Sequence, residues 1–498
     1  MIWSASITRS TMDRIQTGLL RPDRDEHAAF MYAGLADCPS DRRLLIRDVD
    51  LVPDDEFIPS DRGAYRQITP RAVARAAIKA DRLGLSLVWA HSHPMADRTV
   101  GFSRDDLATH HRAHPTLIEL TQGRPVGSLL FGEHAVAGEV WTADGPPAPL
   151  SHLRVLGPHL EDLRAKPTHE LAGGVSSTYL RQVLMFGIAG QRRLSELCVA
   201  IVGAGGGGSL LVQMLCHLGV GRVIVIDPDI ISVSNLSRVV GATQRHLHDG
   251  LPKVSIAAAM AAEIPGDTIC TPIVGDITYV DDAMQILGAD FAFLATDTAH
   301  ARHAFNLITH QYLIPGIQVG AKVTPAPDSD GIGTIHVMNR SVLLGTGCLH
   351  CAGAIPAAEL HRELQTEEER NAQHYIHHGN DIDDPSVITL NSIATAHAAT
   401  DFMFAATGLA TGDLQHRVHY PLDHRTRRRP FVKTPGCLWC GTTNPLSAYA
   451  RGDLWPLQLR PGASPAHIQF TSEHLRTRSR RHQLSQRFRA AARAFARP

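Results

Sequence analysis

The sequence has no apolar stretch that approaches the roughly 20 residues a helix needs to cross a bilayer. Nor does it begin with a basic segment and an apolar run of about 7 to 15 residues, the pattern of a secretory signal. Its formal net charge is only −1, which gives no chain-wide attraction to nucleic acid or to an anionic membrane. We therefore expect a cytoplasmic protein whose partners are proteins or metabolites, with neither nucleic acid nor membrane among them.

Cysteine is scarce, with 8 among 498 residues, and half of these fall in two Cys-x-x-Cys pairs. In a reducing compartment such pairs point to metal binding rather than to disulfides. Four thiolates can surround one structural zinc ion, so we predict that ion at Cys348, Cys351, Cys437 and Cys440. A redox-active pair is the alternative, but no thioredoxin-like pattern accompanies these cysteines.

The chain is long enough for two or three separate cores. Residues 1–150 mix short β-like runs with two helical stretches, which predicts a compact α+β domain. A Gly- and Pro-rich break then predicts a linker over residues 151–175 that carries one short helix. Residues 461–498 are rich in Arg and Ala and poor in acids, which predicts a basic tail, either helical or solvated.

From residue 197 the pattern changes to an apolar run, a glycine-rich turn, a helix and a second apolar run. This order is typical of a βαβ unit, and two later apolar runs extend it. We predict a doubly wound parallel sheet in a domain of residues 176–460, with strands over 198–202, 222–227, 269–274 and 291–295 and a helix over 209–218.

Two histidines follow an apolar run near the front of the chain. His91 and His93 are two residues apart at the end of a predicted strand, so they point to the same face. Ser103 and Asp106 follow within one helical turn of each other and add a hydroxyl and a carboxylate. Two histidines, one carboxylate and an open fourth position describe a catalytic zinc site, whereas two ordinary strand-end histidines are the alternative.

These residues, over about the first 145 positions, resemble the JAB/MPN (JAMM) metalloprotease family, whose members remove ubiquitin-like proteins from amines or trim their C-termini. The resemblance implies that His91, His93 and Asp106 bind zinc and that Ser103 supports the oxyanion. It also implies that Glu26 is the general acid and base, with Glu56 available instead. The segment from 94 to 103 is a couple of residues longer than the usual motif.

The glycine-rich turn contains Gly203, Gly205, Gly206 and Gly208, which let backbone amides approach a phosphate at a helix N-terminus. Asp227 ends the next predicted strand, where an acid can bind a ribose hydroxyl. An NAD-dependent dehydrogenase would explain these residues equally well. The stretches that follow, residues 227–238, 252–253 and 295–302, do not fit that alternative.

Those stretches, with Tyr179-Leu-Arg-Gln182 and Gly190-Gln191 ahead of the first strand, resemble the ThiF/MoeB superfamily of ubiquitin-activating-like enzymes. The resemblance covers about residues 175–450 and implies a Rossmann-like adenylyltransferase that uses ATP and Mg²⁺ and acts as a homodimer. It implies that Arg238 and Lys253 contact phosphates, that Asp297 holds Mg²⁺, and that Arg181 reaches into the partner's site. Asp229 and Asn235 join the residues expected to bind the nucleotide or its metal. Taken singly, each has an ordinary structural explanation.

No cysteine lies between residues 352 and 436, where ubiquitin-type activating enzymes carry the cysteine that forms a thioester. Cys216 and Cys270 lie in apolar patterns and are expected in the core. The main hypothesis is a bifunctional enzyme that processes a ubiquitin-like protein or sulfur carrier and adenylates its C-terminal glycine, with a conjugating enzyme as a further partner. The alternatives are adenylation of a small-molecule or peptide carboxylate in a sulfur-transfer pathway, and a scaffold with degenerate sites.

Overall fold

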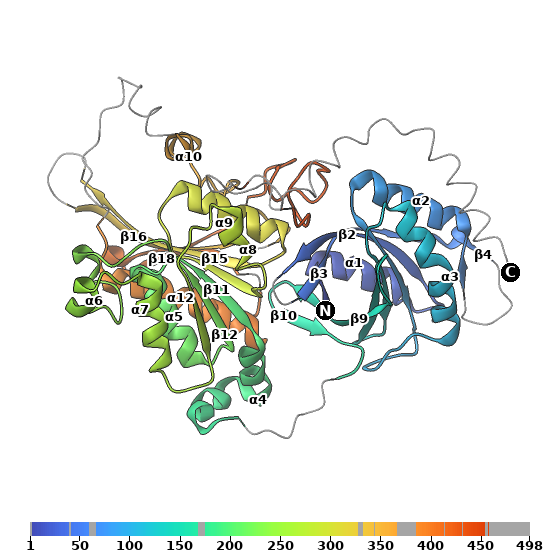
Figure 1. The fold of residues 1–498 in the computed structure, drawn as a ribbon, viewed down its shortest axis with the longest axis horizontal. Coiled ribbons are helices and arrows are strands. Elements are labelled where there is room, and N and C mark those ends of the chain that lie inside the picture. The colour runs from blue at the N-terminus through green and yellow to red at the C-terminus, as the bar shows by residue number, and fades with distance from the viewer. Residues whose placement is uncertain are drawn as a thin grey trace.

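The computed structural model describes residues 2–38, 41–58, 66–167, 175–326, 332–342, 344–365, 385–412, 414–430, 432–453 and 457. These residues form two eight-stranded sheets that follow each other along the chain and lie side by side (Figure 1). The predicted basic tail, residues 461–498, lies outside the described residues. No helix in the described ranges combines the length and the apolar character required to span a bilayer.

The first sheet is mixed and curls back on itself, because β9 pairs with both β8 and β1. Helix α1 (Arg9–Leu19) packs its apolar side chains on one face, and α2 (Pro70–Leu83) and α3 (Arg104–Leu120) lie on the other. The strands are β1 (Ile2–Thr8), β2 (Ala28–Asp37), β3 (Asp41–Leu51), β6 (Ser86–Ser92), β7 (Val126–Phe131), β8 (Val136–Trp141), β9 (Ala148–Leu156) and β10 (Leu160–Leu163). A separate two-stranded ladder joins β4 (Phe57–Ile58) to β5 (Gln67–Ile68).

The predicted linker is wrong over residues 151–163. This segment completes β9 and forms β10, and the structure describes no helix there. Leu153 and Val155 are fully buried, since they pair with β1 from the very start of the chain and fill the core of the first sheet. The Gly- and Pro-rich break before residue 151 marks a connection between β8 and β9. It does not mark the end of the sheet.

The second sheet has the strand order β13-β12-β11-β14-β15-β16-β17-β18, parallel from β13 to β15 and antiparallel beyond. It confirms the predicted Rossmann-like core. Its parallel strands are β11 (Cys198–Val202), β12 (Arg222–Ile226), β13 (Ile269–Ile273), β14 (Phe291–Leu294) and β15 (Gly316–Pro325). Its antiparallel strands are β16 (Ile332–Val342), β17 (His416–Tyr420) and β18 (Arg425–Arg429).

Helices cover both faces of this sheet, with α5, α7 and α12 below and α8 and α9 above in Figure 1. The described helices of this part are α4 (Leu180–Glu196), α5 (Gly206–Leu218), α6 (Gln244–His248), α7 (Lys253–Ala262), α8 (Val280–Met284), α9 (Ala299–Gln311), α10 (Ala357–Leu364) and α12 (Ile388–Thr407), with a short 3-10 turn, η3 (Val233–Asn235). Apolar residues of β3, β9 and β10 join the core of the second sheet, so the two sheets share a buried boundary.

Candidate functional sites

The front site gathers the two histidines and the carboxylate expected to bind metal. His91 is the next-to-last residue of β6, His93 follows the strand directly, and Asp106 lies in the first turn of α3. Ser103 caps that helix: its hydroxyl accepts from the Asp106 amide at 3.1 Å, and the Asp106 carboxylate accepts from the Ser103 amide at 2.7 Å. This reciprocal capping box fixes the carboxylate relative to the strand.

The geometry of this cluster fits a zinc ion. One ligand atom each from His91, His93 and Asp106 lies within 4.8 Å of the others. His91 Nε2 is buried and makes no hydrogen bond within the described part of the chain, although it lies 3.2 Å from Asp106 Oδ1. Burial raises the pKa of Asp106, but the adjacent imidazoles of His91 and His93 outweigh burial and hold that pKa well below its usual range. The carboxylate therefore stays ionised, as a metal ligand must.

The structure separates the two candidate general bases. Glu26 lies just before β2, with Oε1 3.8 Å from His93 Nε2, and burial raises the pKa of its carboxyl group. Glu56 instead forms a two-armed ion pair with Arg75 on α2. Glu26 therefore lies beside the His91–His93–Asp106 cluster, whereas Glu56 is paired with Arg75. The sequence around Glu26 does not distinguish it from Glu56. Glu26 reaches the site because β2 pairs with β6, which places Ala28, two residues after Glu26, beside His91.

The glycine-rich turn joins β11 to α5, and at Gly203, Gly206 and Gly208 it is packed too tightly for a side chain. Gly203 has a φ of 97°, a backbone conformation that favours glycine. A Cβ on Gly208 would lie 1.8 Å from Gly203 O, so this position requires glycine. Helix α5 starts within the glycines at Gly206, earlier than the predicted start at residue 209. At Gly205, the N-cap, a Cβ would meet nothing within 4 Å, so this turn leaves open space at the helix N-terminus.

Two acidic residues after β12 contact the glycine-rich turn and the lysine that starts α7. Asp227 is buried, and its carboxylate accepts from the backbone amides of Ala204 at 2.7 Å and Asp229 at 2.8 Å. Burial raises the pKa of Asp227, and the two amide hydrogen bonds oppose that rise. Lys253 starts α7 and places Nζ 2.7 Å from Asp229 Oδ2. Asp227 thus links β12 to the glycine turn, and its expected contact with a ribose stays a prediction.

Three further predicted residues lie at the carboxyl edge of the same strands. Arg238 runs across the glycine turn, where a Cβ on Gly206 would lie 3.3 Å from its side chain. Asn235 is buried at the end of η3, and its side chain accepts from the Ser232 amide at 3.1 Å. Asp297 follows β14, is exposed, and has no hydrogen-bond or ion-pair partner among the described residues.

Sequence reasoning missed Asn391, in the first turn of α12. A Cβ on Gly206 would lie 2.5 Å from Asn391 Nδ2, so this amide sits directly against the glycine turn. It also donates to Ser386 Oγ at 3.2 Å. No local signal identifies Asn391, because α12 lies far from the glycine turn in the sequence, near the other end of the domain.

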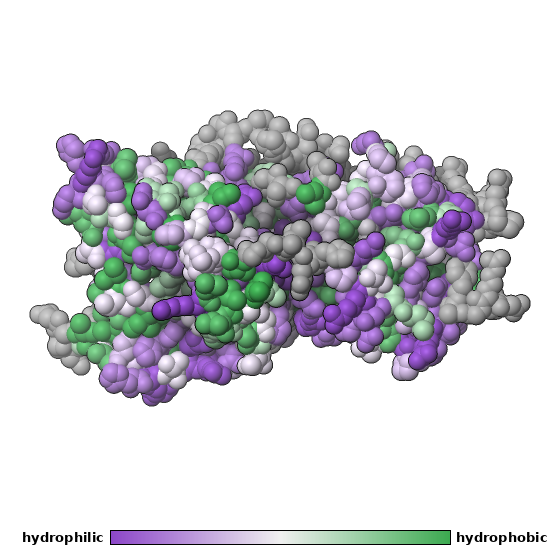
Figure 2. All heavy atoms as spheres, turned by 90° about the horizontal axis from the view of Figure 1, so that it is seen from below, coloured by the Kyte–Doolittle hydropathy of each residue, from purple (hydrophilic) through white to green (hydrophobic). Residues whose placement is uncertain are grey.

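Arg181 lies at the start of α4 and is exposed. Around it the helix presents large apolar side chains, with Leu184 at 88%, Met185 at 55% and Ile188 at 51% exposure. Figure 2 shows this helix as a hydrophobic area on the face seen from below. The neighbouring Gln182 and Gln191 donate to the carbonyls of His217 at 2.7 Å and Leu218 at 2.9 Å, which attach α4 to the end of α5.

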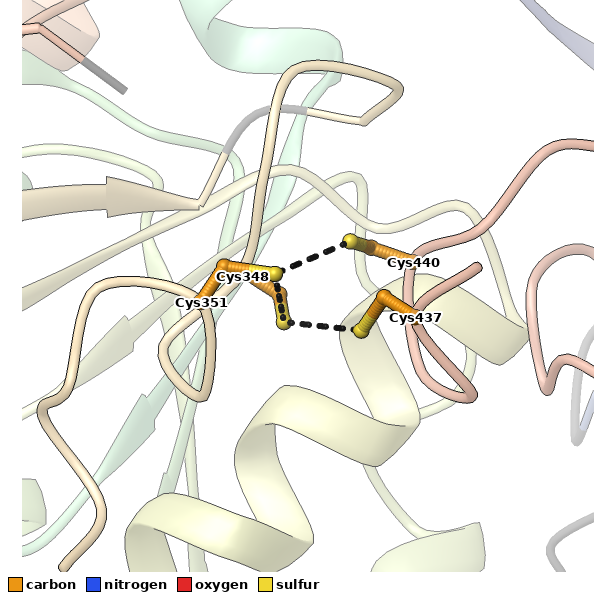
Figure 3. A group of neighbouring side chains, drawn as sticks. All are labelled: Cys348, Cys351, Cys437 and Cys440. Carbon is orange, nitrogen blue, oxygen red and sulfur yellow. Dashed lines mark hydrogen bonds between the residues drawn. The ribbon is translucent and has the colours of Figure 1, made fainter. Parts of the chain in front are cut away.

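The four predicted zinc cysteines come together from two loops (Figure 3). Their sulfur atoms are separated by 3.6 Å between Cys348 and Cys351, 3.8 Å between Cys348 and Cys437, and 3.7 Å between Cys351 and Cys440. A tetrahedron with Zn–S bonds of about 2.3 Å has edges of about 3.8 Å. The cluster therefore has the size of a zinc site. His350 is a neighbour, with Nε2 2.9 Å from His303 Nδ1.

A profile of the ThiF family matches residues 179–436, and the front site lies before that span. SAMP-activating enzyme E1 of Haloferax volcanii is 33% identical over 132 residues, which cover 26% of this chain and 47% of that protein. Adenylyltransferase and sulfurtransferase UBA4 of Yarrowia lipolytica is 30% identical over 183 residues, 36% of this chain and 42% of that protein. Sulfur carrier protein ThiS adenylyltransferase of Bacillus subtilis is 32% identical over 179 residues, 36% of this chain and 50% of that protein. The chain thus spans about half the length of these relatives or less.

Proposed function

Because the chain belongs to the ThiF family, we propose that it uses ATP to adenylate the C-terminal carboxylate of a small ubiquitin-like or sulfur-carrier protein. The family match across residues 179–436 carries this proposal, and the names of the relatives agree with it: one acts on the sulfur carrier ThiS and one activates SAMP. These names favour a sulfur-transfer setting over protein conjugation.

The proposed reaction joins the carboxylate to the α-phosphorus of ATP. A carboxylate oxygen forms the new P–O bond, the bond between the α-phosphorus and the bridging oxygen breaks, and pyrophosphate leaves. Negative charge accumulates on the phosphates, and Arg238 and Lys253 would balance it. Mg²⁺, when bound at Asp297, would neutralise further phosphate charge. Amides of the glycine turn and Asn391 would orient the nucleotide at the N-terminus of α5.

The acyl-adenylate would then pass directly to an external nucleophile. Burial raises the pKa of Cys216 to about 11 and that of Cys270 to about 12, so neither forms a thiolate readily. A thiol or thiocarboxylate on a separate protein would attack the acyl carbon and release AMP. The enzyme would need no thioester cysteine of its own.

We propose a homodimer that brings α4 of one subunit to the nucleotide site of the other. The exposed apolar side chains of α4 beside Arg181 support this arrangement, since such a patch is typical of a protein interface. We also propose that the four-cysteine cluster holds a structural zinc ion, on the basis of its sulfur spacing.

We further propose a JAB/MPN-like peptidase at the front site. Zinc, when bound by His91, His93 and Asp106, would supply Lewis acidity toward the substrate carbonyl and the attacking water. Glu26 would take a proton from that water and give it to the leaving amine. The placement of Glu26 at 3.8 Å from His93 carries this second proposal.

ATP–pyrophosphate exchange tests the first proposal. Exchange that requires a small protein ending in Gly-Gly is expected, whereas exchange supported by free amino or fatty acids alone would contradict it.

For the front site, metal analysis should find about two zinc ions per chain by the ligand count. A His91→Ala variant should lose one of them, and an unchanged zinc content would exclude the front metal site.

A further inference from the structure

A pocket of about 110 Å³ opens beside the front site. Glu26, His91 and Asp106 line part of this pocket, so a group bound in it would lie next to the peptide bond that the proposed peptidase cleaves. The rest of its wall comes from the start of α2, the middle of α3, β6 and the β4–β5 ladder. None of the predicted catalytic roles uses this space.

One wall of the pocket is apolar, whereas polar and charged side chains form the rest of its lining. Phe57, Ile68 and Val73 are buried at 8%, 8% and 1% exposure, and Trp89 adds a partly buried aromatic wall. An engineered apolar cavity of about 150 Å³ holds one benzene molecule, so this pocket has room for one aliphatic side chain. This apolar wall and the small volume of the pocket together fit one apolar side chain.

Two guanidinium groups also line the pocket, and they differ in their pairing. Arg66 stacks on the Phe57 ring at 4.0 Å and donates to Asp54 Oδ1 at 3.0 Å, so its charge is largely balanced. Arg112, on α3, is exposed and has no ion-pair partner in the described ranges. Arg112 can therefore bind an anionic group on a ligand that fills the pocket.

Resting on the proposed peptidase function, we propose that this pocket binds the side chain of an apolar residue immediately C-terminal to the cleaved glycine, with Arg112 binding its free carboxylate. A glycine on the acyl side has no side chain, so only the leaving side can fill an apolar pocket next to the metal. The substrate class is then a precursor with a very short C-terminal extension that begins with an aliphatic residue. The front site would trim precursors and would not release lysine conjugates.

The trimming step is a hydrolysis. The amide C–N bond after the glycine breaks, the water hydroxyl ends on the glycine carbonyl carbon, and the water proton ends on the amine of the released residue. Glu26 carries that proton. The product is the glycine carboxylate that the nucleotide site is proposed to adenylate.

Ten-residue synthetic peptides ending in Gly-Gly-Leu, Gly-Gly-Gly and Gly-Gly-Lys test the pocket. Zinc-loaded wild type should cleave the Leu peptide with a kcat/KM at least about tenfold above the other two. In a Val73→Phe variant, which fills the pocket, kcat/KM for the Leu peptide should fall to the value for the Gly-Gly-Gly peptide, so that the preference is lost. Arg112→Ala should abolish the preference for a free C-terminal acid over an amide.

Calorimetry with a Glu26→Gln variant separates the two proposals, because binding can be measured without cleavage. The Leu peptide should bind at least about tenfold more tightly than the Gly peptide, and Val73→Phe added to Glu26→Gln should remove the difference. Equal binding, or equal cleavage of all three peptides, overturns the pocket assignment while leaving the peptidase intact. If the Glu26→Gln variant binds the Leu peptide selectively but the wild-type protein cleaves none of the peptides, the peptidase proposal is wrong and the pocket assignment stands.

Discussion

Arg47 on β3 and Ser447 are joined by two hydrogen bonds, from Nη1 to the Ser447 carbonyl at 3.1 Å and from Nη2 to Ser447 Oγ at 3.0 Å. The same guanidinium donates to the carbonyls of Asn444 and Tyr449. Arg47 is buried, and the segment it holds follows the second cysteine pair. One side chain thus attaches the first sheet to the loop that closes the cysteine cluster.

Replacing Arg47 with Met should destabilise this boundary, because three carbonyl groups, two of them on buried residues, would lose their donor. We expect a loss of about 2–4 kcal/mol in the free energy of unfolding and a thermal midpoint lower by roughly 5–15 °C. Differential scanning calorimetry measures the change. Arg14→Met, which removes a single hydrogen bond to the Val49 carbonyl at 3.3 Å, serves as the control. An equal effect of the two substitutions would show that Arg47 has no special role.

Loss of one cysteine ligand should release the proposed structural zinc. In Cys437→Ser the zinc content should fall by about one ion per chain, because a hydroxyl group is a poor zinc ligand compared with a thiolate. Inductively coupled plasma mass spectrometry measures this. Cys216→Ser, at a buried cysteine outside the cluster, should keep the full zinc content. A Cys437→Ser protein with unchanged zinc would refute the site.

Four parallel strands of the second sheet, β11 to β14, could be predicted because their signals are local. Each of the four is a short, mostly apolar run, and the glycine turn marks the first crossover. The linker prediction failed over residues 151–163 because β9, besides pairing with β8 and β10, pairs along much of its length with β1, at the other end of the domain. The local pattern of apolar and polar residues carries no information about such a distant partner strand.

The candidate sites show the same limit. Cys-x-x-Cys spacing and the His91–His93 spacing identify their clusters, since each ligand pair is local. The choice between Glu26 and Glu56 is not local: it depends on the pairing of β2 with β6 and on Arg75, which engages Glu56. Asn391 reaches the glycine turn only through the packing of α12 on α5, so no motif contains both.

Lys253 should be essential for exchange. Lys253→Ala should lower kcat/KM for ATP–pyrophosphate exchange by about 100-fold or more, because one preorganised cation is lost from the phosphate site. Arg245→Ala on the neighbouring α6 is the control, since Arg245 is exposed and, among the residues that the structure describes, forms an ion pair only with Asp249, at 3.6 Å. Similar losses in both variants would point to a general effect on this region rather than to phosphate contact.

The enzyme should form no thioester at Cys216 or Cys270. Burial raises their thiol pKa values to about 11 and about 12, so the thiols stay protonated at pH 8 and become thiolates only as the pH approaches those values. Mass spectrometry after iodoacetamide treatment at pH 8 should find both unmodified in the folded protein and modified after denaturation. Cys216→Ser and Cys270→Ser should keep wild-type exchange. A reductant-sensitive adduct at either residue would contradict direct transfer of the adenylate.

If Arg181 acts across the proposed dimer, two inactive variants should restore each other. Arg181→Ala has an intact Lys253, and Lys253→Ala has an intact Arg181, so a mixed dimer contains one complete site. After unfolding and refolding an equal mixture, about a quarter of the wild-type exchange activity should return, because half of the dimers are mixed and each has one working site.

Adding Leu184→Glu to both variants places a charge on the exposed face of α4 and should prevent recovery by dissociating the dimer, as measured by light scattering. Leu446→Glu, at another exposed leucine, should leave recovery unchanged. A refolded mixture that stays inactive while remaining dimeric would place Arg181 outside the partner's site.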